Sequence, residues 1–342
     1  MLKEALLWEK SPMGKTIRCQ LCMRKCIIDE GKFGWCGTRL HKDGKLYSVT
    51  YGQVASMSIS PIEKKNMYNF FPGSIWFSLG SLGCNFRCRG CLNWDTACCD
   101  VAKSLKKANY LSPEMAVMKA KKNRCKGIAF TYNEPTMWFE YTLDVCKLAK
   151  EEGLSTCYVT NGFMSPQALQ MISPYLDGLS LDLKGGFMES YARLADVSDI
   201  NIIFVNGSDA KRKYAMHVEV STTVIPGFNS TEKEAKEICS WIFAELGKDT
   251  PWHLNQFFPY GELKEVSPTP VNMLETMRQV GLKEGLLYVY ISNVPGHMAN
   301  NTYCQKCKKV VIKRKEFDEI ENKLSEGHCP GCQSLIFGRF SF

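Results

Sequence analysis

Seventeen cysteines in 342 residues constrain this chain more than any other feature of its sequence. Eleven of them form three clusters, and the remaining six have no ligand spacing, so we interpret those six as small buried hydrophobic residues. The clusters are Cys19, Cys22, Cys26 and Cys36; Cys84, Cys88 and Cys91; and Cys304, Cys307, Cys329 and Cys332. Because a cytosolic chain keeps its thiols reduced, such clusters indicate metal ligands rather than disulfides.

The composition is that of an ordinary folded protein, with 45% hydrophobic and 23% charged residues. No apolar run approaches the roughly 20 residues of a membrane helix. Residues 1–10 mix charges into a short apolar stretch and lack a small-residue cleavage site, so they do not resemble a signal peptide. We therefore expect a cytoplasmic protein with no membrane partner. The formal net charge of +8 permits nucleic-acid binding without requiring it, and we do not expect such a partner.

Residues 73–300 alternate short β-branched or aromatic runs with segments of helical length. The predicted strands are 75–80, 128–132, 157–160, 179–183, 217–224, 253–258 and 287–291. Alternating strands and helices predict right-handed βαβ units and a parallel sheet, and seven strands suffice for most of a (β/α) barrel. We expect an N-terminal Cys-rich lobe at 1–72 and a C-terminal metal-binding tail at 301–342. Residues 196–216 break the alternation and receive no assignment.

Polar residues follow most of the predicted strands. They are Cys84, Asn133 with Glu134, Asn161, Asp182 with Lys184, the run 224–227, and Asn293 with His297. In parallel α/β sheets and barrels, ligands bind at the carboxyl ends of the strands, where the loops converge. The sequence therefore predicts one polar site along that edge.

The middle cluster has the spacing CxxxCxxC. Three thiolates on one loop can hold three irons of a [4Fe–4S] cube, and the fourth iron then lacks a protein ligand and can chelate a substrate or cofactor. The alternative is a zinc knuckle completed by a distant cysteine. Zinc sites prefer CxxC pairs, and a triplet directly behind a strand favours the iron–sulfur cluster.

The last cluster consists of two CxxC pairs, Cys304 with Cys307 and Cys329 with Cys332, separated by twenty-one residues. This pattern predicts a closed four-thiolate site for zinc or a single iron, which would fold a tail too small to bury its own core. The first cluster is more ambiguous. Its four cysteines within eighteen residues are compatible with zinc, one iron or a second Fe–S cluster, and the spacing favours a structural metal without excluding a cluster that delivers electrons.

Several motifs together resemble those of the radical S-adenosylmethionine (SAM) enzymes, over nearly the whole chain. The resemblance is greatest to the branch related to pyruvate formate-lyase activating enzymes and to the radical SAM proteins of the AmmeMemoRadiSam system. The motifs are CNFRCRGCLNW at 84–94, TYNEP at 131–135, VTNG at 159–162, LDLKG at 181–185, VIPGFN at 224–229 and NVPGH at 293–297.

This resemblance implies specific roles. The cysteines of the 84–91 loop would ligate the [4Fe–4S] cluster, and the amino and carboxylate groups of SAM would chelate the open iron. Glu134, together with Asn133, would accept hydrogen bonds from the SAM ammonium group. Asn161 would hold the ribose, and Asp182 and Lys184 would contact SAM. A carboxylate, a cation and neutral amides are chemically complementary to the charged groups of SAM.

The resemblance also implies the reaction. An electron donor such as a ferredoxin or flavodoxin would reduce the cluster, and reductive cleavage of SAM would give a 5′-deoxyadenosyl radical that abstracts a hydrogen atom. The relatives point to a protein or peptide substrate. Radical chemistry on a small molecule or an RNA is the alternative, and a non-catalytic scaffold with three structural metal sites is a third interpretation. The sequence assigns no catalytic acid or base.

One position departs from the family. Relatives often carry an aromatic residue directly before the third cysteine of the loop, near the adenine, whereas this chain has Gly90. Phe86 and Trp94 are the aromatic residues nearest in sequence that would replace it.

Overall fold

The computed structural model describes residues 2–11, 14–315 and 317–340. Its contacts divide the chain into two compact units. The first comprises residues 1–59, 76–177 and 199–206, and the second comprises residues 60–75, 178–198 and 207–342. This division runs across the three predicted domains, whose boundaries stay predictions. No helix among the described residues has the length and apolar character needed to cross a membrane.

Most elements of the first unit are short strands around a few helices. They are β1 (Lys3–Glu4), β2 (Trp8–Lys10), β3 (Thr16–Cys19), β4 (Ile27–Asp29), β5 (Arg39–Lys42), β6 (Lys45–Ser48), β7 (Gln53–Val54), β8 (Ser56–Pro61), β9 (Ile75–Gly80), α1 (Trp94–Ala97), α2 (Val101–Ser104), η2 (Leu105–Lys107), β10 (Asn109–Tyr110), α3 (Pro113–Lys122), β11 (Gly127–Phe130), η3 (Pro135–Trp138), α4 (Phe139–Glu151), β12 (Ser155–Thr160), α5 (Pro166–Ile172) and η4 (Ser173–Tyr175).

The second unit alternates strands and helices before it ends in the cysteine-rich tail. Its elements are η1 (Ile62–Lys65), β13 (Gly178–Asp182), α6 (Met188–Ala195), β14 (His217–Val224), α8 (Glu232–Trp241), η5 (Ile242–Leu246), β15 (Trp252–Gln256), η6 (Gly261–Leu263), α9 (Val271–Lys283), β16 (Val289–Ser292), η7 (Met298–Asn300), β17 (Thr302–Tyr303), β18 (Val310–Arg314) and β19 (Ile320–Asn322). Helix α7 (Asn201–Arg212) and the strands β8 and β9 have residues in both units.

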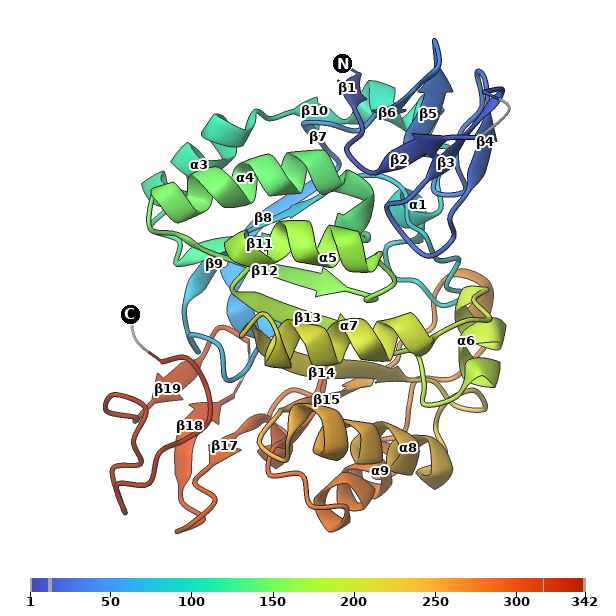
Figure 1. Ribbon diagram of the computed structural model, residues 1–342. Helices are drawn as coiled ribbons and strands as arrows, with labels where there is room; N and C mark the ends of the chain where they lie inside the picture. The colour runs from blue at the N-terminus through green and yellow to red at the C-terminus, as the bar shows by residue number, and fades with distance from the viewer. Residues whose placement is uncertain (1, 12–13, 316, 341–342) are drawn as a thin grey trace. The chain divides into compact units, whose positions relative to one another are not determined.

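Eight strands form the main sheet, and all seven predicted strands are among them. In the first unit β9, β11 and β12 pair in parallel, and in the second unit β13, β14, β15 and β16 do the same. Helices α4 and α5 run alongside β11 and β12 (Figure 1). This arrangement confirms the predicted α/β fold with a parallel, partial-barrel sheet. The eighth strand, β8, was not predicted, because its sequence SMSISP lies in the region assigned to the N-terminal lobe.

Local capping residues explain where several helices begin. Ser165 caps α5, with Pro166 in the first turn, and Thr231 caps α8. Pro135 begins the short helix η3, which leads directly into α4. The segment 196–216, which the sequence left unassigned, contains α7. The β-branched run at its start, NIIFV, is helical despite its composition, because tertiary contacts override local propensity.

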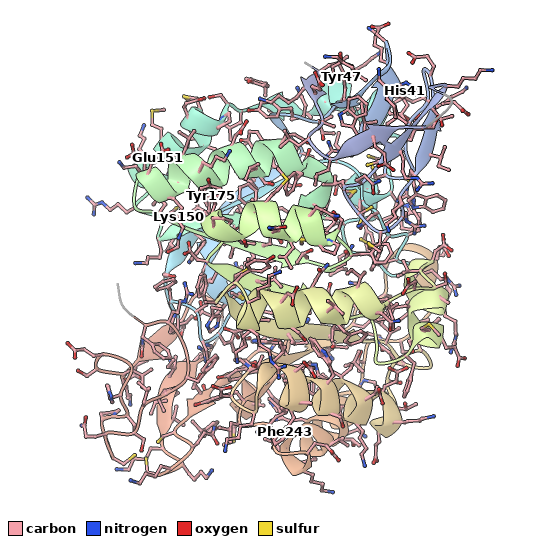
Figure 2. The ribbon with its side chains drawn as sticks, viewed as in Figure 1. His41, Tyr47, Lys150, Glu151, Tyr175 and Phe243 are labelled. Atoms are coloured by element: carbon pink, nitrogen blue, oxygen red, sulfur yellow. The ribbon has the colours of Figure 1, made fainter. Side chains whose placement is uncertain are left out.

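The N-terminal lobe consists of two small antiparallel sheets, β2-β3-β4 and β1-β6-β5. His41, on β5 and labelled in Figure 2, is buried against β4. Its Nδ1 lies 2.9 Å from the Ile28 carbonyl oxygen, and its Nε2 lies 2.9 Å from a Glu30 carboxylate oxygen. These contacts hold the two sheets together around the first cysteine cluster.

The C-terminal tail is a three-stranded antiparallel sheet, β17-β18-β19. Buried tail residues, among them Cys304, Val311 and Cys329, form one apolar cluster with Tyr288 and Tyr290 of the β16 region. The tail therefore has little core of its own and depends on the second unit for much of its buried surface.

Candidate active site and cysteine centres

The loop that carries Cys84, Cys88 and Cys91 begins directly after β9. Gly83 leads into it with a φ of +81°, and a Cβ at this position would lie 2.5 Å from the Cys36 carbonyl oxygen, so only glycine fits there without a shift. All three cysteine side chains are partly exposed. The loop thus presents its thiols at the carboxyl end of a parallel strand, as the sequence predicts.

Desolvation raises the pKa of the Cys84 thiol well above its ordinary value, and the nearby Cys88, Glu134 and Cys91 act in the same direction. The Phe86 N–H donates to the Cys84 sulfur at 3.4 Å. A metal ion that binds a buried thiol replaces its proton, so this burial does not prevent Cys84 from acting as a ligand. The loop thus places three possible sulfur ligands behind one strand.

Glu134 joins the ends of two neighbouring strands, β11 and β12. It is buried, and its Oε1 accepts hydrogen bonds from the Thr136 N–H, the Thr136 hydroxyl and the Thr160 hydroxyl at 3.0, 2.6 and 2.8 Å. Its Oε2 accepts one bond, from the Asn161 N–H at 2.8 Å. Burial raises the pKa of this carboxyl group, and these hydrogen bonds oppose the rise. Since a carboxylate oxygen accepts two donors readily, Oε2 has room for one more.

Asn133 supports the backbone that precedes the cysteine loop. Its Oδ1 accepts a hydrogen bond from the Ser81 N–H, and its Nδ2 donates to the Gly83 carbonyl oxygen, both at 2.9 Å. Both ends of the Asn133 amide therefore hold the chain between β9 and Cys84. The predicted contact of Asn133 with the SAM ammonium group stays a prediction.

Asn161 connects this network to the cysteine loop itself. Its Nδ2 donates to the Asn85 Oδ1 at 2.8 Å, and its Oδ1 accepts from the Phe163 N–H at 3.0 Å. Asn85 is buried, and its own Nδ2 has no partner among the described residues. Sequence reasoning missed Asn85, although its place directly after Cys84 was an available signal.

Asp182 and Lys184 belong to the second unit, where they follow β13. Lys184 Nζ donates to Asp182 Oδ2 at 2.5 Å, and both side chains are partly exposed. The other carboxylate oxygen, Asp182 Oδ1, is buried and has no partner among the described residues. Asn229 braces this region, since its Nδ2 donates to the Lys184 carbonyl oxygen at 2.9 Å.

Phe86 and Trp94, the two residues that would replace the missing aromatic side chain at Gly90, are both at least partly buried. Phe86 is buried and packs against Phe163, with 5.5 Å between ring centroids. Trp94 begins α1 and is half-buried. Trp94 is therefore the more accessible of the two.

The tail cysteines form a compact metal site. Among the described residues, only this group of histidine, cysteine or acidic side chains has three or more ligand atoms that all lie within 4.8 Å of one another. Cys304 Sγ lies 3.5 Å from Cys332 Sγ, and Cys307 Sγ lies 3.6 Å from Cys329 Sγ. These separations suit four thiolates around one tetrahedral ion, whose metal–sulfur bonds are about 2.3 Å long.

Each CxxC pair of the tail closes with the same backbone feature. Lys308 and Gln333, which directly follow the second cysteine of each pair, both have positive φ angles, of 61° and 58°. Hydrogen bonds from Ser334 are the main cause that lowers the pKa of Cys332 to about 6. The closed four-sulfur geometry agrees with the sequence analysis.

The donor sets of the structure fit the cofactors that the sequence implied. The 84–91 loop offers three sulfurs and no fourth, which matches a [4Fe–4S] cluster with an open iron. The unpartnered Asp182 Oδ1 and the partly used Glu134 Oε2 are acceptors for an ammonium or hydroxyl group, and Lys184 is a cation for a carboxylate. Each of these groups has capacity for a ligand such as SAM.

Comparison with known proteins agrees with this chemistry. Residues 79–242 match the family model of the radical SAM superfamily. The chain is 36% identical over 317 residues to an uncharacterized protein of Methanocaldococcus jannaschii, and the match covers 93% of each protein. It is 27% identical over 161 residues to the isethionate sulfite-lyase activating enzyme of Oleidesulfovibrio alaskensis, which covers 47% of this chain and 50% of that enzyme.

Solved structures show the same fold. A radical SAM methyltransferase from Sphaerobacter thermophilus has a TM-score of 0.52 to this chain at 14% identity, and the match covers 85% of this chain and 77% of that one. The parallel sheet, the CxxxCxxC loop behind its first parallel strand and the matches in sequence together establish that this chain belongs to the radical SAM superfamily and is related to activating enzymes.

Proposed function

We propose that the chain binds a [4Fe–4S] cluster through Cys84, Cys88 and Cys91, cleaves SAM reductively at that cluster and abstracts a hydrogen atom from a protein or peptide. The observation that carries this proposal is the hydrogen-bonded connection from the cysteine loop through Asn85 and Asn161 to Glu134. It fixes the loop to the ends of the neighbouring parallel strands, where ligands of such folds bind.

In this proposal the polar side chains divide into two groups. Asn133 and Asn85 position the loop, because Asn133 donates to the Gly83 carbonyl oxygen before Cys84, and Asn85, directly after Cys84, accepts from the Asn161 side chain. Glu134 contacts the charged amino-acid end of SAM, because its Oε2 can accept a hydrogen bond from the ammonium group. The resemblance of the LDLKG motif adds Asp182 and Lys184 as further residues that bind SAM.

Asn161 has one remaining donor on Nδ2 and one remaining lone pair on Oδ1, which suits the hydroxyl groups of a ribose. Trp94, a partly exposed aromatic residue shortly after the cysteine loop, stacks on the adenine. When bound, the cluster and SAM supply the 5′-deoxyadenosyl radical that performs the abstraction. The chain itself contributes binding, orientation and exclusion of water.

A protein or peptide substrate is supported by the relation to an activating enzyme, which by its name acts on a lyase. An iron–sulfur or flavin protein of low potential, such as a ferredoxin or flavodoxin, would supply the electron.

The first experiment tests SAM cleavage. Anaerobically reconstituted protein, reduced with dithionite, should form 5′-deoxyadenosine from SAM, and Cys88→Ala should reduce this product to background. Cys125→Ala is the matched control, since Cys125 is a buried cysteine with no cluster neighbours, and it should retain the activity. An intact cluster that yields no 5′-deoxyadenosine, or undiminished cleavage by Cys88→Ala, contradicts the proposal.

The second experiment tests the substrate class. A deuterated extract, separated into protein, RNA and small molecules, is offered to the reduced enzyme with SAM. Deuterium should enter 5′-deoxyadenosine from the protein fraction and disappear after protease treatment. Transfer from the RNA or the small-molecule fraction instead would assign the reaction to the alternative substrate.

A further inference from the structure

The first cysteine cluster surrounds one cavity in the N-terminal lobe. Cys19 ends β3, Cys22 and Cys26 lie between β3 and β4, and Cys36 lies before β5. All four line the same cavity, which contains about 320 Å³ of empty space including the part that opens to solvent. Three of the four side chains are buried, and Cys26 is partly exposed. Four sulfur ligands therefore converge on one place.

The sulfurs of this cluster are too widely spaced for one preformed ion site. Unlike the tail, no three of these four residues have sulfur atoms that all lie within 4.8 Å of one another, and all four belong to the described residues. Four thiolates around a single ion must lie close together, because each bond is only about 2.3 Å long. Thiolates that each bind a different iron of a cube stand further apart. The wider spacing thus favours a cluster.

Backbone donors reach three of the four thiols, whose pKa values burial raises above the ordinary value. The backbone N–H groups of Leu21, Arg24 and Trp35 donate to the sulfurs of Cys19, Cys22 and Cys26, respectively. Hydrogen bonds of this kind tune the reduction potential of an iron–sulfur cluster.

A buried cation also lies beside this cluster. Arg39 is 1% exposed, and its electrostatic partners are Glu140, 2.7 Å away, and the sulfurs of Cys19 and Cys36. A guanidinium group in this position favours negative charge on the ligands.

This cavity adjoins the 84–91 loop. Asn85 lines it, and the Arg24 Nε donates to the Asn85 carbonyl oxygen at 2.5 Å. From the other side, the Arg87 guanidinium donates to the Trp35 carbonyl oxygen at 2.8 Å. At Gly83, a Cβ would lie 2.5 Å from the Cys36 carbonyl oxygen, so the two cysteine segments are in direct backbone contact. A redox centre in the cavity would be a neighbour of the first one.

We propose that Cys19, Cys22, Cys26 and Cys36 bind a second [4Fe–4S] cluster, which passes single electrons to the cluster at Cys84, Cys88 and Cys91. A low-potential iron–sulfur or flavin protein gives one electron to the oxidised second cluster, which returns to its oxidised state when the first cluster is reduced. No bond forms or breaks, and no proton moves. The binding of the cluster stands on the cysteine geometry alone, whereas its electron transfer rests on the proposed function.

The test removes the ligands of the first cluster and measures the iron and sulfide that the chain still binds. The full-length variant Cys84→Ala/Cys88→Ala/Cys91→Ala, reconstituted anaerobically, should hold about four iron and four sulfide per chain beyond the tail ion, with the absorption of an iron–sulfur cluster. Zinc in place of this iron, in a folded variant, would overturn the proposal, and so would an absence of iron. If the triple variant does not fold, the iron content of the wild type is compared with that of Cys22→Ala/Cys26→Ala. The wild type should hold roughly eight cluster irons and the double variant about four.

Activity separates this inference from the proposed function. Cys22→Ala/Cys26→Ala should still cleave SAM with dithionite, which can reduce the first cluster directly, but should lose at least tenfold in rate with a flavodoxin-type donor. Equal rates with both donors would refute the relay while leaving the function intact. A wild type with two clusters and no SAM cleavage would refute the function while leaving the second site intact.

Discussion

The two four-cysteine regions at the ends of the chain use the same ligand type to build different sites. In the tail, two CxxC pairs place four sulfurs within 4.8 Å of one another. In the N-terminal lobe, cysteines spaced CxxCx3Cx9C surround a cavity without such close sulfur contacts. The number of cysteines alone therefore does not specify the kind of metal centre. The backbone that separates them sets the sulfur spacing, and the spacing selects one ion or a cluster.

Their surroundings differ as well. The tail cysteines lie among apolar side chains of the second unit, including Tyr288 and Ile336. The N-terminal cysteines have a buried ion pair, Arg39 with Glu140, beside them and contact the loop of the first cluster. One environment suits a structural ion that completes a small core, and the other suits a redox centre.

The largest expected effect is on the tail. Cys329→Ser removes one of four ligands from a closed site, so the bound ion should be lost and the tail should unfold. Structural zinc sites contribute about 10–16 kcal/mol to the folding of small domains. Limited proteolysis and metal analysis should show a cleaved, metal-depleted tail with unchanged iron in the clusters. Ser334→Ala, which affects only a hydroxyl 3.3 Å from Cys332 Sγ, is the matched control and should keep the ion. A Cys329→Ser protein with its full tail metal would refute this assignment.

The next effect concerns the buried cation. Arg39→Met leaves Glu140, 2% exposed, without its charged partner, so the free energy of unfolding should fall by about 3–5 kcal/mol. Arg39→Met/Glu140→Gln should recover part of this loss. Lys45→Met is the control in the same lobe, because its ion pair with Glu4 is half exposed on both sides and should cost less than about 1 kcal/mol. Denaturant unfolding measures all three, and equal losses for Arg39→Met and Lys45→Met would contradict the account.

A smaller effect on the free energy of unfolding is expected at Glu219, on β14. Glu219 is buried and accepts hydrogen bonds from His217, His253 and the N–H groups of Tyr68 and Asn69. Burial alone would raise the pKa of its carboxyl group. The hydrogen bonds and charge interactions of the two histidines together outweigh burial and lower this pKa from 4.5 to about 2. Its ionised form therefore stabilises the fold above pH 4.5, and this contribution is lost as the pH falls towards 2.

The stability difference between wild type and Glu219→Gln should be about 3 kcal/mol at pH 7, and it should shrink below pH 4.5. Unfolding free energies measured across this range check the prediction. A difference that stays constant with pH would show that the carboxylate charge has no part in it.

Much of the fold was predictable because strand patterns are local. All seven strands that the sequence predicts belong to the main sheet. Helix α7 was missed, because its β-branched start is stabilised by tertiary contacts. The Asn206 Nδ2 on this helix, for example, donates to the carbonyl oxygens of Gly162 and Met164 at 2.8 Å.

The candidate site was predictable only in part. Motifs located the cysteines and the polar strand ends, but they could not show that the Asn133 amide holds the backbone that leads into the loop. The pairing of Arg39 with Glu140 joins residues 101 positions apart and depends on burial, which a single sequence does not reveal. Long-range polar contacts of this kind need the fold.

The most direct test of the account is whether an iron of the 84–91 loop is open to SAM. Electron–nuclear double resonance on the reduced Cys22→Ala/Cys26→Ala protein, which keeps only the first cluster, would be recorded with SAM labelled with ¹⁵N and ¹⁷O in its amino-acid part. The account predicts hyperfine coupling from both labels to the cluster. An intact, reduced cluster with SAM present and no coupling from either label would contradict it.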